Sequence, residues 1–146
     1  MSKEPEHHLL LVDQDLDYLD WATKHLGAEG LKILRCDSAD KASQVVKKAP
    51  IDVVICDIKL DPFDGVELLQ LIRASSPETI TILTAVSPTT SQIIEATQKG
   101  ALDVLRKESL AFELRQVVES ALQTVDQRRE IGPLSDQRPG LTGKTM

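Results

Sequence analysis

The sequence predicts an α/β fold in which five parallel strands form a doubly wound sheet. Five short apolar runs have the length and composition of buried strands, and they occupy residues 9–12, 31–36, 52–56, 79–83 and 102–105. The stretches between them have apolar residues at helical spacing. Strands that alternate with helices indicate a parallel sheet with helices on both faces, because each crossover between parallel strands needs a helix-length connection.

Each stretch between the strands also has end signals that fit a helix. Gly30 fits the end of the first helix, and Ser38 and Pro50 fit the N-cap and the end of the second. Gly100 closes the fourth. The last stripe is the clearest, with apolar residues at Leu110, Leu114, Val117, Val118, Ala121, Leu122 and Val125.

The chain is predicted to hold one folded domain and a tail. The apolar stripe stops after Val125, and the segment that follows is rich in Pro, Gly and polar residues. We expect a domain over residues 7–126 and a linker or flexible tail over 127–146. Since Val125 and Ile131 have no other segment of this chain to bury against, we expect a homodimer through the last helix.

The composition excludes several classes of protein. A net charge of −6 argues against direct nucleic-acid binding. No apolar run approaches the ~20 residues of a membrane span, and no secretory signal is visible, so we expect a cytoplasmic protein. Cys36 and Cys56 should remain thiols, because strand order 2-1-3-4-5 separates them by two strand spacings, ~9.6 Å.

Polar side chains follow several strands at the point where each strand ends. Right-handed crossovers favour the strand order 2-1-3-4-5, the flavodoxin-like (βα)5 arrangement, which binds ligands where the order reverses, between strands 1 and 3. The residues that this order brings to one edge of the sheet are Asp13, Gln14, Asp15, Asp57, Thr84 and Lys107.

This set of side chains suits a magnesium ion and a phosphoryl group. Neighbouring carboxylates repel one another, and a hard cation with oxygen ligands relieves that repulsion. A carboxylate can also accept a phosphoryl group as a nucleophile, while Lys107 and Thr84 hold the remaining oxygens. Taken singly, Asp13 and Asp15 are better explained as helix caps. The convergence of acids with Thr84 and Lys107 at one edge of the sheet favours the site.

Four motifs, in order, resemble the receiver domain of two-component response regulators. "LLLVDQD" resembles the first strand with its acidic pair, and "VVICDIKLDPFDG" resembles the third strand with the phosphoacceptor, Asp57. "ITILTA" has the switch hydroxyl, Thr84, and "KGALDVLRK" ends in the lysine of the fifth strand, Lys107. The resemblance covers residues 8–124.

The resemblance implies a signalling function. Such a domain takes a phosphoryl group from a histidine of a sensor kinase, with Mg²⁺, and switches an output such as transcription. It catalyses only its own phosphorylation and dephosphorylation, so it is not otherwise an enzyme. By the family pattern the metal ligands are Asp13, Asp57, the backbone carbonyl of Lys59 and, weakly, Gln14, and the switch region comprises Thr84 and Val104.

Several positions depart from the family pattern. Gln14 replaces the second acid of the pair, so we expect weaker Mg²⁺ binding unless Asp15 or Asp61 compensates. Asp61 stands where a proline is usual. Val104 stands where an aromatic switch residue is usual, so aromatic rotation does not couple the site to the output. Glu108 replaces the usual proline after the lysine.

Two other interpretations of the acidic motif stay open. The "DQD" segment also resembles the D-x-D motif of haloacid dehalogenase-like phosphohydrolases, with Asp13 as nucleophile and Asp15 as acid/base. Alternatively, Gln14 is the mark of a pseudo-receiver that binds partners without phosphate. The tail "GLTGKTM" resembles the segment that opens the ATPase domain of nitrogen-regulator-type, sigma-factor-activating transcription activators, which implies an output domain C-terminal to this chain.

Overall fold

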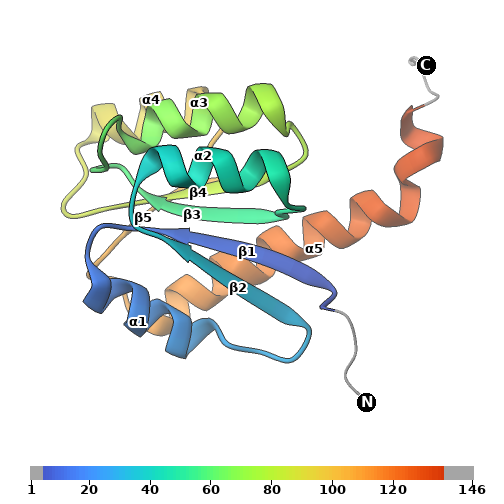
Figure 1. The fold of residues 1–146 in the computed structure, drawn as a ribbon, viewed down its shortest axis with the longest axis horizontal. Helices are drawn as coiled ribbons and strands as arrows, with labels where there is room; N and C mark the ends of the chain where they lie inside the picture. Colours follow the sequence, from blue (N-terminus) through green and yellow to red (C-terminus); the bar gives the residue numbers. More distant parts are fainter. Residues whose placement is uncertain (1–4, 137–146) are drawn as a thin grey trace.

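The computed structural model describes residues 5–136, which form a parallel sheet flanked by helices (Figure 1). The strands are β1 (His7–Val12), β2 (Leu31–Cys36), β3 (Val53–Asp57), β4 (Ile80–Ala85) and β5 (Asp103–Arg106). The helices are α1 (Leu16–Leu26), α2 (Ala39–Lys48), α3 (Gly65–Ser75), α4 (Thr90–Gln98) and α5 (Ala111–Asp136). The strand order is β2-β1-β3-β4-β5 and all pairs are parallel, which confirms the predicted fold class.

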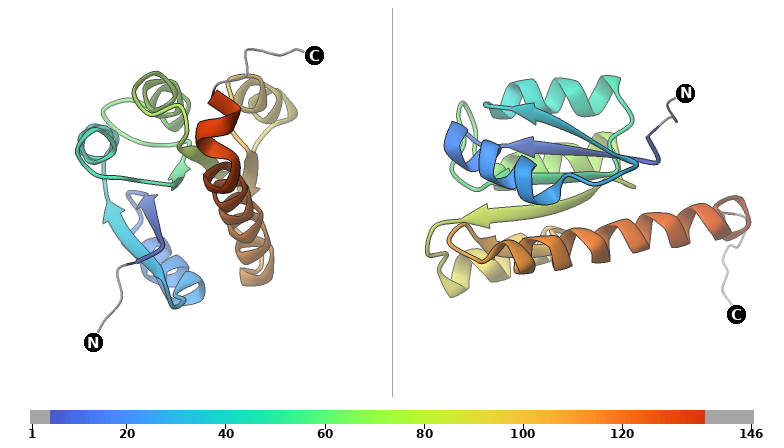
Figure 2. Two further views of the ribbon diagram at one scale, coloured as in Figure 1. Left: turned by 90° about the vertical axis from the view of Figure 1, so that its right-hand side faces the viewer. Right: turned by 90° about the horizontal axis from the view of Figure 1, so that it is seen from below.

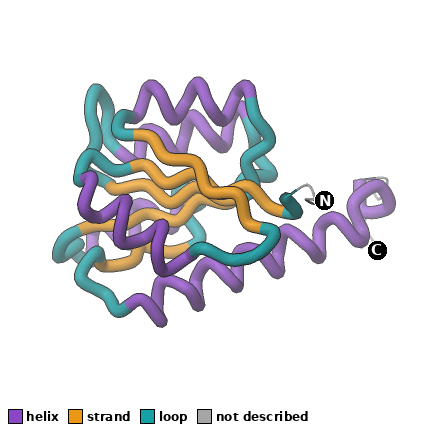
Figure 3. The backbone as a smooth tube through the Cα atoms, turned by 60° about the horizontal axis from the view of Figure 1, so that its bottom comes forward, coloured by secondary structure: helices purple, strands orange, loops and turns teal. Residues whose placement is uncertain are grey.

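The sheet is the middle of three layers. Helices α2, α3 and α4 cover one face and α1 and α5 cover the other, as Figures 2 and 3 show from other directions. Because side chains alternate along a strand, Val54 packs in the cluster under α2 and α3, whereas Val53 and Ile55 pack in the cluster under α1 and α5. Cys36 and Cys56 lie on the two strands that flank β1, and both are free thiols, as expected.

The helix ends follow capping signals that are visible in the sequence. The Ser38 side chain accepts a hydrogen bond from a backbone N–H in the first turn of α2. Gly100 follows α4 with a φ of 110°, a left-handed conformation that glycine adopts without strain. Helix α1 ends earlier than predicted, at Leu26, because Gly27 caps it; Gly30 instead forms the turn before β2, with a φ of 84°.

Helix α5 is the longest helix, with 26 residues, and it continues past the edge of the sheet (Figure 2). Leu114, Val118, Ala121 and Val125 are buried against the sheet. Val125 is only 6% exposed, so the expectation that it lacks a partner in this chain is wrong; Ile131 is 55% exposed. None of the helices within residues 5–136 has the length and apolar character needed to cross a lipid bilayer.

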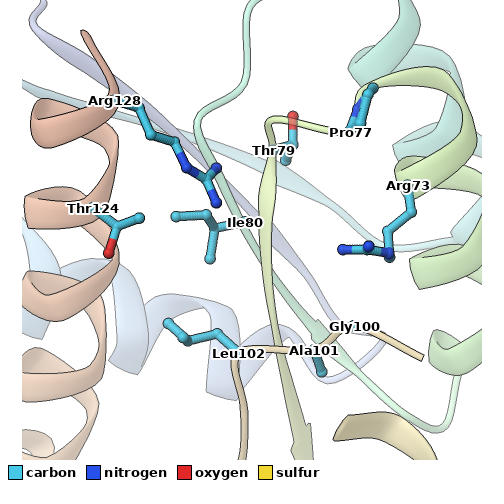
Figure 4. A pocket seen from close by; sticks show the side chains of 9 residues that line it. All are labelled: Arg73, Pro77, Thr79, Ile80, Gly100, Ala101, Leu102, Thr124 and Arg128. Atoms are coloured by element: carbon cyan, nitrogen blue, oxygen red, sulfur yellow. The ribbon is translucent and has the colours of Figure 1, made fainter. Parts of the chain in front are cut away.

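Polar contacts fasten the second half of α5 to the amino edge of the sheet. Arg129 forms an ion pair with Asp52, with 3.1 Å between Nη2 and Oδ1. Arg128 donates a hydrogen bond to the carbonyl of Glu78 at 3.0 Å. Arg128 and Arg73 also line a crevice of about 280 Å³ between α5 and α3 (Figure 4). The helix therefore leaves the sheet in a fixed direction, and the "GLTGKTM" segment lies outside the described residues.

Candidate functional site

Four side chains from four different strands meet at the carboxyl edge of the sheet. Asp13 directly follows β1 and Lys107 directly follows β5, while Asp57 ends β3 and pairs with Thr84 of β4. Asp13, Asp57 and Thr84 are 2%, 8% and 1% exposed. The topology thus brings together four of the six residues that the sequence predicted at this edge.

The ammonium group of Lys107 lies between the two carboxylates. Its Nζ is 2.8 Å from Asp13 Oδ2 and 3.2 Å from Asp57 Oδ2. The Lys107 side chain is 12% exposed, so these ion pairs are largely shielded from water. The side chains of Asp13, Asp57 and Lys107, when ionised, have two negative charges and one positive charge, which leaves the site attractive to a further cation.

Burial and the neighbouring charges shift two pKa values at the site. Burial raises the pKa of Asp13 above 3.8, and the hydrogen bonds from Lys107 and from the backbone N–H of Asp15 only partly offset it. Burial is also the largest influence on the pKa of Lys107 and lowers it, but the hydrogen bond to Asp13 and the charges of Asp57 and Asp13 together raise that pKa above 10.5. Burial thus disfavours the ionised form of Asp13, whereas the two carboxylates favour the charged form of Lys107.

Two buried oxygens at the site are available to a ligand. Among the described residues, Thr84 Oγ1 has no hydrogen-bond partner, and Asp13 Oδ2 has only its ion pair with Lys107. No three acidic, histidine or cysteine side chains within residues 5–136 converge closely enough to hold a metal ion by themselves. A cation here would need backbone, amide or water oxygens as well, and Mg²⁺ commonly retains several waters.

The start of α3 fixes the backbone of Asp57. A Cβ at Gly65 would lie 2.3 Å from the backbone oxygen of Asp57, so only glycine allows α3 to approach this closely. The backbone N–H of Lys59 donates to Asp57 Oδ1 at 3.2 Å, which orients the carboxylate. The role that the resemblance gives to the Lys59 carbonyl stays a prediction.

Two departures from the family pattern contact each other. Gln14 is exposed, and its Nε2 donates a hydrogen bond to Asp61 Oδ2 at 3.1 Å. A carboxylate thus lies beside the position where the family has its second acid. Asp15 is instead the N-cap of α1, where it accepts hydrogen bonds from the backbone N–H groups of Asp17 and Tyr18. The helix-cap interpretation of Asp15 is therefore correct.

Sequence reasoning missed Tyr18. Its ring lies beside the Lys107 ammonium, with 4.8 Å between Nζ and the ring centroid. The only signal was its position in the first turn of the helix that follows Asp13, and that position does not reveal which way the ring points. Val104 is half-buried and pairs with Leu83 of β4, the residue before Thr84. Its switch role stays a prediction.

Comparison with curated proteins finds transcriptional regulators. The chain is 29% identical to the transcriptional regulatory protein GlrR of Escherichia coli over 94% of this chain and 30% of that protein. It is 30% identical to the transcriptional regulatory protein ZraR of Salmonella typhimurium over 94% of this chain and 31% of that protein. The chain therefore spans about 30% of the length of these relatives.

Solved structures and a family model agree with these relatives. The crystal structure of NtrX from Brucella abortus in complex with ADP has a TM-score of 0.80 and 28% identity, covering 99% of this chain and 31% of that chain. The beryllofluoride-activated NtrC4 receiver domain dimer shares the fold, with a TM-score of 0.76 and 20% identity over 80% of this chain and 97% of that chain. Residues 9–119 match the model of the response regulator receiver domain. These matches favour neither the phosphohydrolase nor the pseudo-receiver interpretation, and the chain belongs to the family of response regulator receiver domains.

Proposed function

We propose that Asp57 is the phosphoryl acceptor of this receiver domain. The observation that carries the proposal is the position of the Lys107 ammonium, 3.2 Å from Asp57 Oδ2, at the edge where the strand order reverses. Asp57 is also paired in register with Thr84 of the neighbouring strand, whose side chain has a hydroxyl group. The same edge holds Asp13, but its side chain is only 3% exposed, against 11% for Asp57, so Asp57 is the more accessible of the two carboxylates to a phosphoryl donor.

The transfer step is a substitution at phosphorus. A carboxylate oxygen of Asp57 attacks the phosphorus of a phosphohistidine on a sensor kinase, the P–N bond breaks, and the imidazole leaves with the bonding electron pair. Lys107 offsets the negative charge on the phosphoryl oxygens. The Thr84 hydroxyl, which is buried and lacks a partner among the described residues, donates a hydrogen bond to one of them.

We propose Mg²⁺ as the cofactor of this site. The ligands would be Asp13, Asp57, the Lys59 carbonyl and the Gln14 amide oxygen, and the bound ion would neutralise phosphoryl oxygens. The geometry supports a cation at this place, because the buried carboxylates of Asp13 and Asp57 share only one ammonium group among the described residues, that of Lys107. Gln14 provides no charge, so the affinity is lower than three acids would give.

The partners follow from the family and from the relatives. We propose that a sensor histidine kinase donates the phosphoryl group in the cytoplasm, and that a domain C-terminal to this chain produces the output. The relatives are transcriptional regulatory proteins about three times as long as the matched segment, which supports transcription as the output. This chain has a net charge of −6 and is not proposed to bind nucleic acid itself.

We propose that α5 forms a homodimer beyond the edge of the sheet. Val125 no longer supports this idea, since it is buried within the domain. The support is now Ile131, which is 55% exposed and lies five residues before the end of α5, the helix that extends past the sheet in Figure 2. The NtrC4 receiver domain, which shares the fold, is described as a dimer.

Chemical labelling tests the acceptor assignment. A small-molecule phosphodonor with Mg²⁺ should add one acid-labile phosphoryl group to the wild-type chain. Asp57→Asn should abolish the labelling although the variant remains folded by circular dichroism. Persistent labelling of Asp57→Asn at the wild-type level would contradict the proposal.

A further inference from the structure

The ring of Tyr18 lies beside the Lys107 ammonium. Nζ lies 4.8 Å from the ring centroid, within the range at which an aromatic face attracts a cation. Asp13 and Asp57 contact the same ammonium at 2.8 and 3.2 Å. The ammonium is therefore confined by two carboxylates and an aromatic ring, and its side chain is 12% exposed.

The ring itself is held in place by α1. The backbone N–H of Tyr18 donates to Asp15 Oδ1 at 3.3 Å, which is part of the N-cap of the helix. The ring of Trp21 lies 5.6 Å from the Tyr18 ring, and the ring of His25 lies 5.0 Å from Trp21, so aromatic side chains support it along the helix. Tyr18 is half-buried and stays next to the site.

The Tyr18 hydroxyl carries no charge. Burial and the charges of Asp13 and Asp57 raise the pKa of Tyr18 to about 12, so the phenol is neutral throughout the physiological range. What the residue offers Lys107 is the face of its ring.

We propose that Tyr18 is a positioning residue that holds the Lys107 ammonium against Asp57, and thereby increases the rate at which this domain accepts a phosphoryl group. Lysine has a flexible four-carbon stem, so its ammonium needs a wall to stay in one place. Small displacements of a charged group at a reacting centre have large effects on rate. The inference rests on the proposed role of Asp57, and it adds a residue that neither the four motifs nor the family resemblance singles out.

Three variants test the inference. Tyr18→Phe keeps the aromatic face and Tyr18→Leu removes it. Leu26→Ala is the control for packing, because it removes a buried side chain at the other end of α1. We expect Tyr18→Leu to lower the second-order rate of phosphorylation by a small-molecule donor about tenfold, in line with the loss of one cation–π contact. Tyr18→Phe and Leu26→Ala should stay within about twofold of the wild type, since both keep the ring face beside Lys107.

A nuclear magnetic resonance measurement on the unphosphorylated protein tests the geometry alone. The ring should shift the Lys107 Hε resonances upfield in the wild type and in Tyr18→Phe, and this shift should disappear in Tyr18→Leu. Wild-type rates in Tyr18→Leu, or an equal loss in Leu26→Ala or in Tyr18→Phe, would overturn the inference. A wild-type chain that shows the upfield shift but no label on Asp57 would instead overturn the proposed function, and a missing upfield shift would overturn the positioning role.

Discussion

Gln14 Nε2 donates a hydrogen bond to Asp61 Oδ2 at 3.1 Å, so two residues that depart from the receiver pattern lie side by side at the carboxyl edge. The family places an acid at the first position and a proline at the second. Here the first position has no charge, and the carboxylate stands on the loop between β3 and α3. The contact keeps a negative charge beside the position where the family has its second acid.

Restoring the usual acid should strengthen Mg²⁺ binding. Gln14→Asp adds a negative charge worth about 4 kcal/mol of attraction at ~4 Å in an effective dielectric of ~20, before desolvation and repulsion between carboxylates. A quarter of that attraction corresponds to about a fivefold higher affinity. Calorimetric titration of Mg²⁺ into both proteins measures the difference.

The matched variant Asp61→Asn tests whether Asp61 contributes to the same cation. If Asp61 compensates for Gln14, its removal should weaken Mg²⁺ binding severalfold, and Gln14→Asp should restore it. Equal Mg²⁺ affinity in Gln14→Asp and the wild type would mean that the charge at Asp61 already suffices.

Replacing Asp13 should stabilise the fold at neutral pH. Burial keeps the pKa of Asp13 above its ordinary value of 3.8, so the folded protein binds this proton more tightly than the unfolded chain does. That contribution to the free energy of unfolding is fully present below pH 3.8 and is lost as the pH rises through the folded pKa. Asp13→Asn avoids this loss of stability, because an amide does not ionise. The asparagine oxygen can still accept the hydrogen bond from the N–H of Asp15.

Urea unfolding across a pH series measures this effect. The midpoint for Asp13→Asn should exceed that of the wild type at neutral pH, and the gap should narrow as the pH falls toward 3.8. A variant that is less stable at neutral pH would show that the ion pair with Lys107 outweighs the cost of burying Asp13.

A side chain at position 65 should disturb the site and the fold together. In Gly65→Ala the new Cβ would meet the backbone oxygen of Asp57 at 2.3 Å, and backbone cannot move aside cheaply. We expect a loss of about 1–3 kcal/mol in the free energy of unfolding, typical of overpacking. Gly27→Ala is the control, because its Cβ would meet nothing closer than 3.4 Å and should change stability by less than ~0.5 kcal/mol. Similar stabilities of the two variants would contradict this account of how α3 packs.

The proposed dimer predicts a specific effect at the exposed end of α5. Light scattering should give the mass of a dimer for residues 1–146 and of a monomer for Ile131→Glu, because a charge in an apolar helix contact is costly. Gln116→Glu introduces the same charge at an exposed position of α5 about four turns away from Ile131 and should remain a dimer. A wild-type chain that stays monomeric at high concentration, with and without a phosphoryl group, would contradict the proposal.

Local sequence patterns were sufficient for the sheet and for most of the site. Strand order follows from alternating strands and helices, and the carboxyl ends of parallel strands share one edge, so Asp57, Thr84 and Lys107 were placed together correctly. The position of the Tyr18 ring was not predictable, because it depends on how α1 is rotated against the sheet. The width of the apolar stripe on α5 likewise did not show how far the sheet extends, so the burial of Val125 was missed.

Locating the phosphoryl group on the chain tests the central claim most directly. The wild-type protein would be treated with a small-molecule phosphodonor and Mg²⁺, reduced with borohydride so that an aspartyl phosphate becomes homoserine, and digested for tandem mass spectrometry. The account predicts homoserine at position 57 and unmodified aspartate at position 13. Homoserine at Asp13, or at neither Asp13 nor Asp57, would contradict it.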